Sequence, residues 1–268
     1  MASLYETAAR LHDPRVKGRS KHLLADIVIL AVLAVTSGAE GYEAIEEFGK
    51  YHYQTLRKRL RLPNGIPSHD TRNRVFQAIK FRQFERLFLE WTEGLKPEGS
   101  AEHVIAIDGK TVRGSRDGYY DNHAIHLVHA WSVENGICLG QRKTRDKSNE
   151  ITAIPELLDM LCIEGAIITI DAIGTQTAMA ERIVGGGADY IRHIRSHWGV
   201  ENSLHWVLDM SFGEDRQRKR AGMAAENFAL VRKCSLNILK RETGKGSLVT
   251  KRLKAVWSID YLFSLLEN

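Results

Sequence analysis

Two short apolar segments that each end on an aspartate constrain the fold of this chain most strongly. Val104–Asp108 reads VIAID, and Ile167–Asp171 reads IITID. Runs of this length and composition predict buried β-strands. If the two strands are neighbours in one sheet, their terminal carboxylates lie at related positions of one edge. Two such carboxylates repel each other unless a cation joins them, so Asp108 and Asp171 form a candidate metal site.

The pattern of the chain changes between residues 95 and 100, where LKPEGS separates two kinds of sequence. Residues 1–95 read as helices, and a very apolar segment interrupted only by Asp26 predicts a buried helix. After the turn at 63–65, Ser68 or Asp70 can cap the helix that follows. From residue 101 the order is strand, hairpin turning at 134–136, helix, strand and helix, followed by further helices beyond residue 194. We therefore expect an α/β protein with a helical N-terminal domain (1–95) and a mixed-sheet domain (101–268).

The charge distribution points to a polyanionic partner. The net charge is +5, yet the segment from Arg216 to Lys254 alone holds twelve Lys or Arg against two Glu, a net +10. A basic segment on an acidic body is typical of nucleic-acid binding, although a solvated helix face would have the same composition. In the N-terminal region, Arg72, Arg74 and the cluster Arg57–Arg59 are further candidate DNA contacts, although a small helical domain that only packs against its neighbour is an open alternative.

Cysteine usage and hydropathy indicate the cellular compartment in which the protein is expected. Three scattered cysteines form neither a disulfide framework nor a zinc pattern, which favours a reducing cytosol. The N-terminus lacks the layout of a signal peptide, and the longest apolar run is short for a membrane span. We expect a cytoplasmic protein without a membrane partner.

The segment Gly109-Lys110-Thr111 resembles the end of a phosphate-binding loop, but the rest of that loop is missing. The loop requires a glycine five positions before the Gly-Lys pair, and Val104 occupies that position. Nucleotide binding of that type is excluded, which leaves the metal site as the reading of Asp108.

A metal site of this kind needs a third acid from a helix. Spacing alone leaves four candidates open: Glu201, Asp209, Glu214 and Asp215. Glu201, His205 and Asp209 are four residues apart, which predicts that they share one face of a helix. Oxygen ligands suit Mg²⁺ or Mn²⁺, and a pair of such ions supports phosphodiester chemistry.

Three motifs carry a family resemblance. AIDGKTVRGS, TIDAIGTQ and IRSHWGVENSLHWVLDMSFGEDRQR together resemble the H-repeat-associated insertion-sequence transposases, a bacterial DDE group with an RNase H-like catalytic core. LHDPRVKGRSKHLLADIVILAVLAVTSGAEGYEAIEEFG and LPNGIPSHDTRNRVF look like the helical domain that precedes this core. The resemblance spans nearly the whole chain.

The resemblance implies a function and assigns roles to residues. It implies a catalytic and metal-binding triad of Asp108, Asp171 and Glu201 around two Mg²⁺ or Mn²⁺ ions. By similarity, water cuts at the transposon ends, and the freed 3′-hydroxyl attacks target DNA. The implied partner is double-stranded DNA, both terminal inverted repeats and target, with a homodimer to hold two ends and a location at the bacterial nucleoid. The side chains expected to hold phosphates are Lys110, Arg113, Arg195, Arg216, Arg218, Lys219 and Arg220.

The sequence departs from the family after Tyr190. Relatives continue there into a long insert before the helix that carries the glutamate, whereas only 29 residues separate Asp171 from Glu201 in this chain. We read this as an internal deletion that truncates the catalytic domain between the fifth strand and the Glu-bearing helix. The alternative function is therefore a catalytically impaired remnant that binds DNA without catalysis.

Overall fold

The computed structural model describes residues 3–95, 103–117, 123–144, 150–170, 183–185, 189–190 and 199–267. These residues divide into two compact units. The helical unit comprises residues 1–91, 211–213 and 217–268, and the sheet unit comprises residues 92–210 and 214–216.

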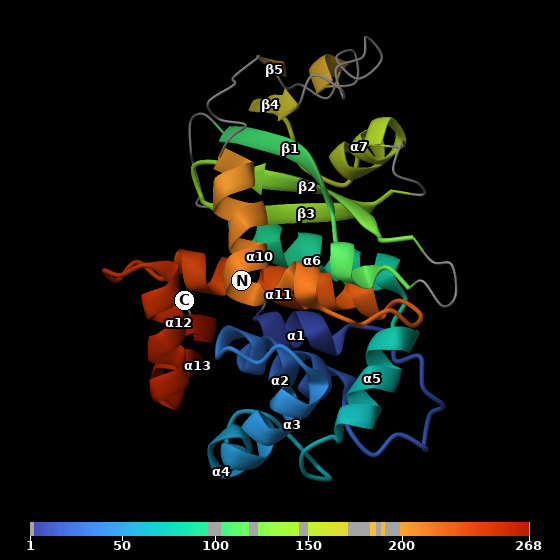
Figure 1. Cartoon of the computed structure of the whole chain (residues 1–268), viewed down its shortest axis with the longest axis vertical. Helices are drawn as coiled ribbons and strands as arrows, with labels where there is room; N and C mark the ends of the chain where they lie inside the picture. Colours follow the sequence, from blue (N-terminus) through green and yellow to red (C-terminus); the bar gives the residue numbers. More distant parts are fainter. Residues whose placement is uncertain are drawn as a thin grey trace. The chain divides into compact units, whose positions relative to one another are not determined.

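The helical unit is built from both ends of the chain (Figure 1). Its N-terminal helices are α1 (Leu4–Ala9), α2 (Leu24–Thr36), α3 (Tyr42–Tyr51), α4 (Tyr53–Leu56), α5 (His69–Ala78) and α6 (Phe81–Glu93). Its C-terminal helices are α11 (Ala224–Arg241), α12 (Leu248–Trp257) and α13 (Ile259–Glu267).

Helix α2 is the apolar segment predicted to be a buried helix, and all of its residues are buried. It packs against α1, α3 and α11. Asp26 is 1% exposed within it, and its carboxylate accepts hydrogen bonds from the Tyr5 hydroxyl (3.0 Å) and from the Leu62 amide (2.8 Å). A buried carboxylate is tolerated where such donors satisfy it, so the one charge in this run ties α2 to two neighbouring segments.

The C-terminal helices belong with the N-terminal helices rather than with the sheet, where the sequence had placed them. Helix α11 packs against α2 and α5, and the Asn227 side chain donates to the carbonyls of Phe76 (2.8 Å) and Ile79 (2.9 Å). The physical reason is that α11 is buried almost all round, so it needs apolar neighbours on every side, and α2 supplies such a surface.

Two predictions about the helical unit have different outcomes. Of the two expected cap residues, Ser68 caps α5, with its hydroxyl accepting from the Thr71 amide at 3.2 Å. The prediction that Arg72 contacts DNA is wrong, because Arg72 is completely buried. Burial lowers the pKa of its guanidinium to about 10.

The sheet unit contains a five-stranded mixed sheet in the order β3-β2-β1-β4-β5. Its elements are β1 (His103–Thr111), η1 (Arg113–Ser115), β2 (His126–Ser132), β3 (Ile137–Lys143), α7 (Glu150–Leu158), β4 (Ala166–Ile170), β5 (Asp189–Tyr190), η3 (Glu201–His205), α10 (Trp206–Phe212) and η4 (Glu214–Arg216). Strands β1, β2 and β3 are antiparallel, and β4 and β5 run parallel to β1.

The predicted hairpin and the helix that follows it are confirmed, whereas most of the helix predicted after the second apolar strand lies outside the described residues. The β2–β3 hairpin turns at 133–136, where Gly136 has φ +62, a conformation that glycine adopts at little cost. Helix α7 packs against β2 and β3, and Figure 1 shows the continuous helix formed by η3 and α10 beginning in front of the sheet. Within the described ranges we find no helix that combines the length and the apolar character of a membrane span.

One strand boundary differs from the prediction. Strand β1 does not end on Asp108 but continues to Thr111, because Gly109, Lys110 and Thr111 still pair with Val128, Leu127 and His126 of β2. On its other side, the parallel ladder with β4 ends at Ile107↔Ile170. Asp108 therefore lies inside a strand, one residue past the end of the ladder with β4.

Candidate functional site

Asp108 has both carboxylate oxygens engaged. Oδ1 accepts a hydrogen bond from the Gly109 amide at 2.8 Å, and Oδ2 lies 3.3 Å from Nδ1 of His205. The side chain is 23% exposed, so the carboxylate is reachable from solvent while its orientation is fixed. Fixed, accessible carboxylate oxygens are what a metal ligand requires.

A pair of histidines continues from Asp108 into the protein. His205 Nε2 lies 3.0 Å from His129 Nδ1, and His129 is completely buried in β2. One set of neutral tautomers satisfies both contacts: His129 Nδ1–H donates to His205 Nε2, and His205 Nδ1–H donates to Asp108. The arrangement therefore orients the Asp108 carboxylate through a continuous chain of hydrogen bonds that begins in β2.

The sequence analysis did not find His129. A signal was present, because a histidine interrupts the apolar strand that runs from Leu127 to Trp131. A buried polar side chain in such a strand requires a partner, but the sequence does not say which one.

Glu201 begins a π-helical turn (η3) that leads directly into α10. Glu201 is exposed, whereas Leu204 and His205 are buried. The prediction that Glu201, His205 and Asp209 share one face assumed a regular α-helix. A π-helical turn has wider i→i+5 bonding that changes this alignment, and such turns are frequent at functional sites.

Lys110 lies among carboxylates. Its ammonium is 2.7 Å from Asp209, 3.1 Å from Asp215 and 3.4 Å from Glu214, and the side chain is 8% exposed. Burial lowers the pKa of Lys110, but the three carboxylates outweigh burial and hold that pKa above its ordinary value. Asp209, Glu214 and Asp215, three of the four acids that spacing had left open, thus gather around this lysine.

Gly109 leaves space for a hydrogen bond between His126 and Glu150 that a larger side chain at this position would block. His126 in β2 is hydrogen-bonded to Glu150 of α7 (2.5 Å) and to the Thr111 hydroxyl (2.8 Å). A Cβ at Gly109 would come within 2.6 Å of His126 Nε2 and still closer to the Glu150 carboxylate. The glycine after Asp108 therefore makes room for the link between the sheet and α7.

The predicted phosphate-contacting residues occupy different environments. The Arg113 side chain is 84% exposed, and Arg216, Arg218 and Arg220 are also exposed. Lys219 is turned inward in the helical unit, with its ammonium 3.9 Å from the Phe228 ring centroid and its hydrogen bond to the Glu40 carbonyl at 2.7 Å. Burial, with a smaller effect of Arg232, lowers the pKa of Lys219 to about 7.

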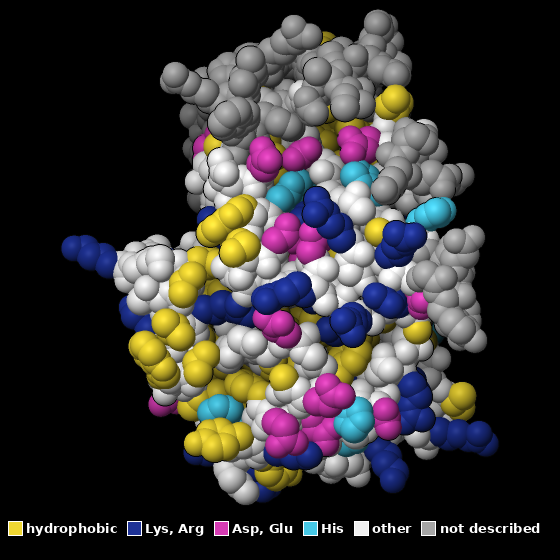
Figure 2. Space-filling view, viewed as in Figure 1, with side chains coloured by type: hydrophobic (Ala, Val, Ile, Leu, Met, Phe, Trp, Pro, Cys, Tyr) yellow, Lys and Arg dark blue, Asp and Glu magenta, His cyan; other side chains and the backbone are white. Residues whose placement is uncertain are grey.

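Two predicted site residues, Asp171 and Arg195, lie outside the described residues. Within the part of the chain that is described, no three His, Cys, Asp or Glu side chains are arranged to hold a metal ion. Figure 2 shows acidic and histidine side chains close together on the face of the sheet unit over which α10 lies. The described site thus consists of an oriented Asp108, the His129–His205 pair and an exposed Glu201.

Comparison with known proteins gives matches over the whole chain. The family described as DDE_Tnp_1-associated matches residues 5–92. The putative transposase YncI of Escherichia coli O157:H7 is 33% identical over 370 aligned residues, covering 99% of this chain and 95% of that protein. The H repeat-associated putative transposase YhhI of Escherichia coli strain K12 is 32% identical over 371 residues, covering 99% and 98%. A protein of Xanthobacter autotrophicus, described as an uncharacterized protein in the dhlA 3′ region, is 44% identical over 213 residues, covering 79% and 71%.

The two long alignments exceed the 268 residues of this chain, so these relatives carry residues that have no counterpart here. The identity nevertheless stays above 30% and extends over nearly the full length of both partners. The chain therefore belongs to the family of H repeat-associated transposases.

Proposed function

We propose that this protein is the DNA transposase of an insertion sequence, which cuts DNA at the ends of the element and joins the freed 3′ ends to target DNA. Family membership supports this class of activity. One observation supports the proposed location of the site. Ile107 and Ile170 are partners in the parallel ladder of β1 and β4. Asp108 and Asp171 are the next residues in the sequence. Side chains that follow paired residues of neighbouring strands are well placed to bind the same ion.

The donor chemistry of the described residues fits a hard divalent cation. Asp108 offers a half-buried carboxylate with a fixed orientation, and Glu201 offers an exposed one. Oxygen donors of this kind suit Mg²⁺ or Mn²⁺. In this proposal Asp108, Asp171 and Glu201 hold a two-metal site. When bound, the ions would activate the attacking water or 3′-hydroxyl and stabilise the leaving oxygen.

The chain itself contributes orientation. The Gly109 amide and His205 fix the two oxygens of Asp108, and His129 fixes the ring of His205. Removing a hydrogen-bond partner that orients a metal ligand typically lowers metal affinity or activity by about 10–100-fold. The mixed sheet and the Glu201-bearing helix that follows it support an RNase H-like core.

The exposed arginines provide the DNA contacts of this proposal. Arg113, Arg216, Arg218 and Arg220 face solvent and can reach phosphates, and Arg195 remains in the predicted set. Lys110 and Lys219 are already engaged by carboxylates or by aromatic rings and a carbonyl, so we assign them to holding the surrounding segments. Double-stranded DNA is the partner, a homodimer would hold two ends together, and DNA binding would place the protein at the nucleoid.

The test is a nicking assay on a plasmid that carries both ends of the element with their flanking DNA, in Mg²⁺ or Mn²⁺. Asp108→Asn should reduce nicking at least about a hundredfold while duplex binding and thermal stability are kept. Glu164→Gln, which changes an exposed acid of the sheet unit, serves as the matched control and should leave nicking unchanged. Equal nicking by the wild type and Asp108→Asn would refute the assigned site.

A second candidate function is a DNA-binding remnant without catalysis. It is favoured by the alignments, which show that relatives carry residues absent from this chain, and by the short connection between Asp171 and Glu201. If the wild-type chain binds duplex DNA but makes no metal-dependent nick, the remnant is the correct assignment. Strand transfer by this chain alone would exclude it.

A further inference from the structure

The loop between α1 and α2 presents a group of exposed basic side chains that is separate in the sequence from the arginines named above. We define the basic loop as residues 12–22, HDPRVKGRSKH. We propose that this loop contacts the phosphate backbone of double-stranded DNA. The choice of DNA as the ligand rests on the proposed function, whereas the position and chemistry of the surface rest on the loop itself.

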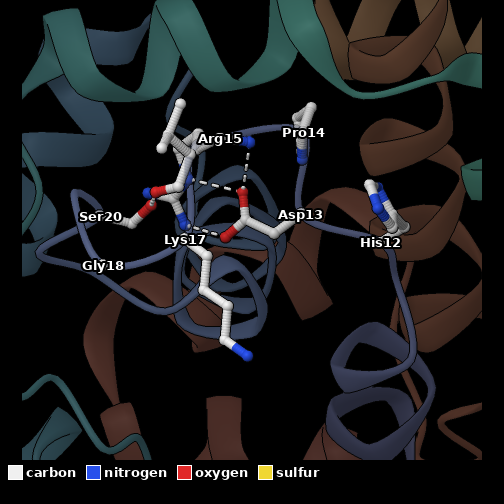
Figure 3. Close-up of a pocket in the computed structure, with 8 residues that line it drawn as sticks. His12, Asp13, Pro14, Arg15, Lys17, Gly18 and Ser20 are labelled. Atoms are coloured by element: carbon white, nitrogen blue, oxygen red, sulfur yellow. Dashed lines mark hydrogen bonds and ion pairs between the residues drawn. The ribbon is translucent and has the colours of Figure 1, made fainter.

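The negative charge of Asp13, the acidic residue of the basic loop, is compensated by Arg15 of the same loop. Asp13 accepts hydrogen bonds from Arg15 Nε (2.8 Å), from Arg15 Nη2 (2.6 Å) and from the Arg15 amide (3.0 Å), as Figure 3 shows. Burial raises the pKa of Asp13, but these bonds and the guanidinium charge outweigh it and hold that pKa below its ordinary value. The pair is therefore ionised at neutral pH, and its charges cancel.

Three positive charges of the loop stay uncompensated. Lys17, Arg19 and Lys21 are all exposed, and none of them forms an ion pair with any residue that the structure describes. In the helical unit, the exposed bases Lys50 and Arg59 have carboxylate partners, whereas Lys80, Arg82 and Arg86 form no ion pair with a described residue, so the loop is distinguished by the close spacing of its three cations. Three unpaired cations within five residues make a local positive field suited to phosphates.

The shape of the loop presents these charges outward. The Arg19 amide donates to the Val16 carbonyl at 3.1 Å, which closes a turn in which Gly18 has φ +82. A side chain at Gly18 would meet nothing within 4 Å, so the glycine serves the turn geometry rather than close packing. Val16 is 65% exposed in the same turn, and Figure 3 shows Lys17 extending away from the Asp13–Arg15 pair.

The loop is held in place at its far end. Arg15 Nη2 donates to the His22 carbonyl at 2.7 Å, and the Asn64 side chain donates to the Lys21 carbonyl. The chain leaves and re-enters the core at Leu11 and Leu24, each 6% exposed. A hollow of about 550 Å³ lies against the loop, lined by residues 12–18 and by Ser20. An anchored loop loses little conformational entropy on binding, so its charges act together.

The test uses the full chain and a fluorescent duplex of random sequence, with anisotropy measured over a range of NaCl concentrations. The triple variant Lys17→Gln, Arg19→Gln, Lys21→Gln should weaken binding roughly tenfold or more near 0.1 M salt and lower the slope of log K against log salt by about 3. The charge-preserving variant Lys17→Arg, Arg19→Lys, Lys21→Arg should keep the wild-type slope.

Two controls decide the outcome. Lys80→Gln, Arg82→Gln, Arg86→Gln removes three exposed bases of the same unit and should change affinity less than about twofold, because these residues are not part of the loop. Gly18→Val keeps every charge but strains the turn, and it should also weaken binding. Equal losses of duplex affinity in the Lys17→Gln, Arg19→Gln, Lys21→Gln variant and in the Lys80→Gln, Arg82→Gln, Arg86→Gln variant would overturn the proposal. It would also be overturned if the loop variant kept its affinity for the duplex and lost binding only to anionic phospholipid vesicles, measured in parallel.

Together with the plasmid-nicking assay, this binding experiment separates the loop proposal from the catalytic proposal. If the wild type binds the duplex through the basic loop but nicks no plasmid, the loop assignment stands and the catalytic one fails. If the wild type nicks and the loop triple variant binds and nicks like the wild type, the catalytic assignment stands and the loop assignment fails.

Discussion

At the scale of single residues, buried charges determine more of this structure than its basic composition suggests. The segment from Arg216 to Lys254 looks like a solvated basic tail, yet Arg232 and Lys233 are 1% and 0% exposed. Arg232 donates to the Phe212 carbonyl at 3.2 Å and lies over the Phe228 ring. Lys219 stacks on the same ring from its own position. Much of this positive charge is therefore structural, and only the outward-facing members remain available for the DNA contacts that we propose.

Lys219 should make stability depend on pH. Its folded pKa of about 7 lies below the ordinary value of 10.5, so between these values the unfolded chain binds the extra proton. Stability must then rise with pH through this window, by up to about 1.4 kcal/mol per pH unit, and the contribution is lost as pH falls through 7. Lys219→Met removes this dependence of stability on pH.

The measurement is urea unfolding of the wild type and Lys219→Met at pH 6, 7, 8 and 9. The free energy of unfolding of the wild type minus that of the variant should increase as pH rises from 7 to 9. Below pH 7 this difference should stay constant. A constant difference at all four pH values would show that Lys219 is not held with a lowered pKa.

At the scale of elements, short turns are attached to the sheet by single side chains. Lys110 of β1 binds Asp215 and Glu214 of η4 and Asp209 of α10. His205 of η3 reaches β1 through Asp108 and β2 through His129. These contacts place the segment that carries Glu201 against the strand that carries Asp108.

Lys110→Met should destabilise the protein by about 3 kcal/mol or more, because it removes the cation that three carboxylates share while Glu214 stays fully buried. Arg113→Met is the matched control, since the Arg113 side chain is 84% exposed and its backbone amide, which keeps its hydrogen bond to Asp215, is unchanged. We expect less than about 0.5 kcal/mol for the control. Urea unfolding of both variants measures the difference, and equal effects would contradict the structural role of Lys110.

At the scale of the whole molecule, the two ends of the chain complete one helical unit. The family match covers residues 5–92, but α2 packs against α11, and the Ser235 hydroxyl donates to the Val32 carbonyl at 3.1 Å. An N-terminal fragment alone would expose the apolar surface that α11 covers.

A fragment of residues 1–95 should therefore fail to fold cooperatively and should aggregate, and co-expression with residues 217–268 should restore a soluble, cooperatively unfolding complex. Circular dichroism during thermal unfolding and size-exclusion chromatography report on both. If residues 1–95 alone show a cooperative transition with the helix content of α1–α6, the N-terminal helices fold independently and do not need the C-terminal helices for stability.

The sequence by itself determined the elements whose signals are local. Periodicity, turn residues and capping chemistry act over a few residues, and they were enough to predict five features. These are the β2–β3 hairpin, α7, the buried α2, the Ser68 cap and the apolar strands before Asp108 and Asp171. The family resemblance, carried by long ordered motifs, was equally readable.

Only the tertiary structure decided which distant elements meet. The extension of β1 to Thr111 depends on its pairing with β2, and the attachment of α11 to α2 depends on which apolar surfaces fit together. His129 and His205 are 76 residues apart, and no local pattern encodes their hydrogen bond. Such contacts are selected by the mutual burial of surfaces that are far apart in the chain, and periodicity within one segment carries no information about its partner.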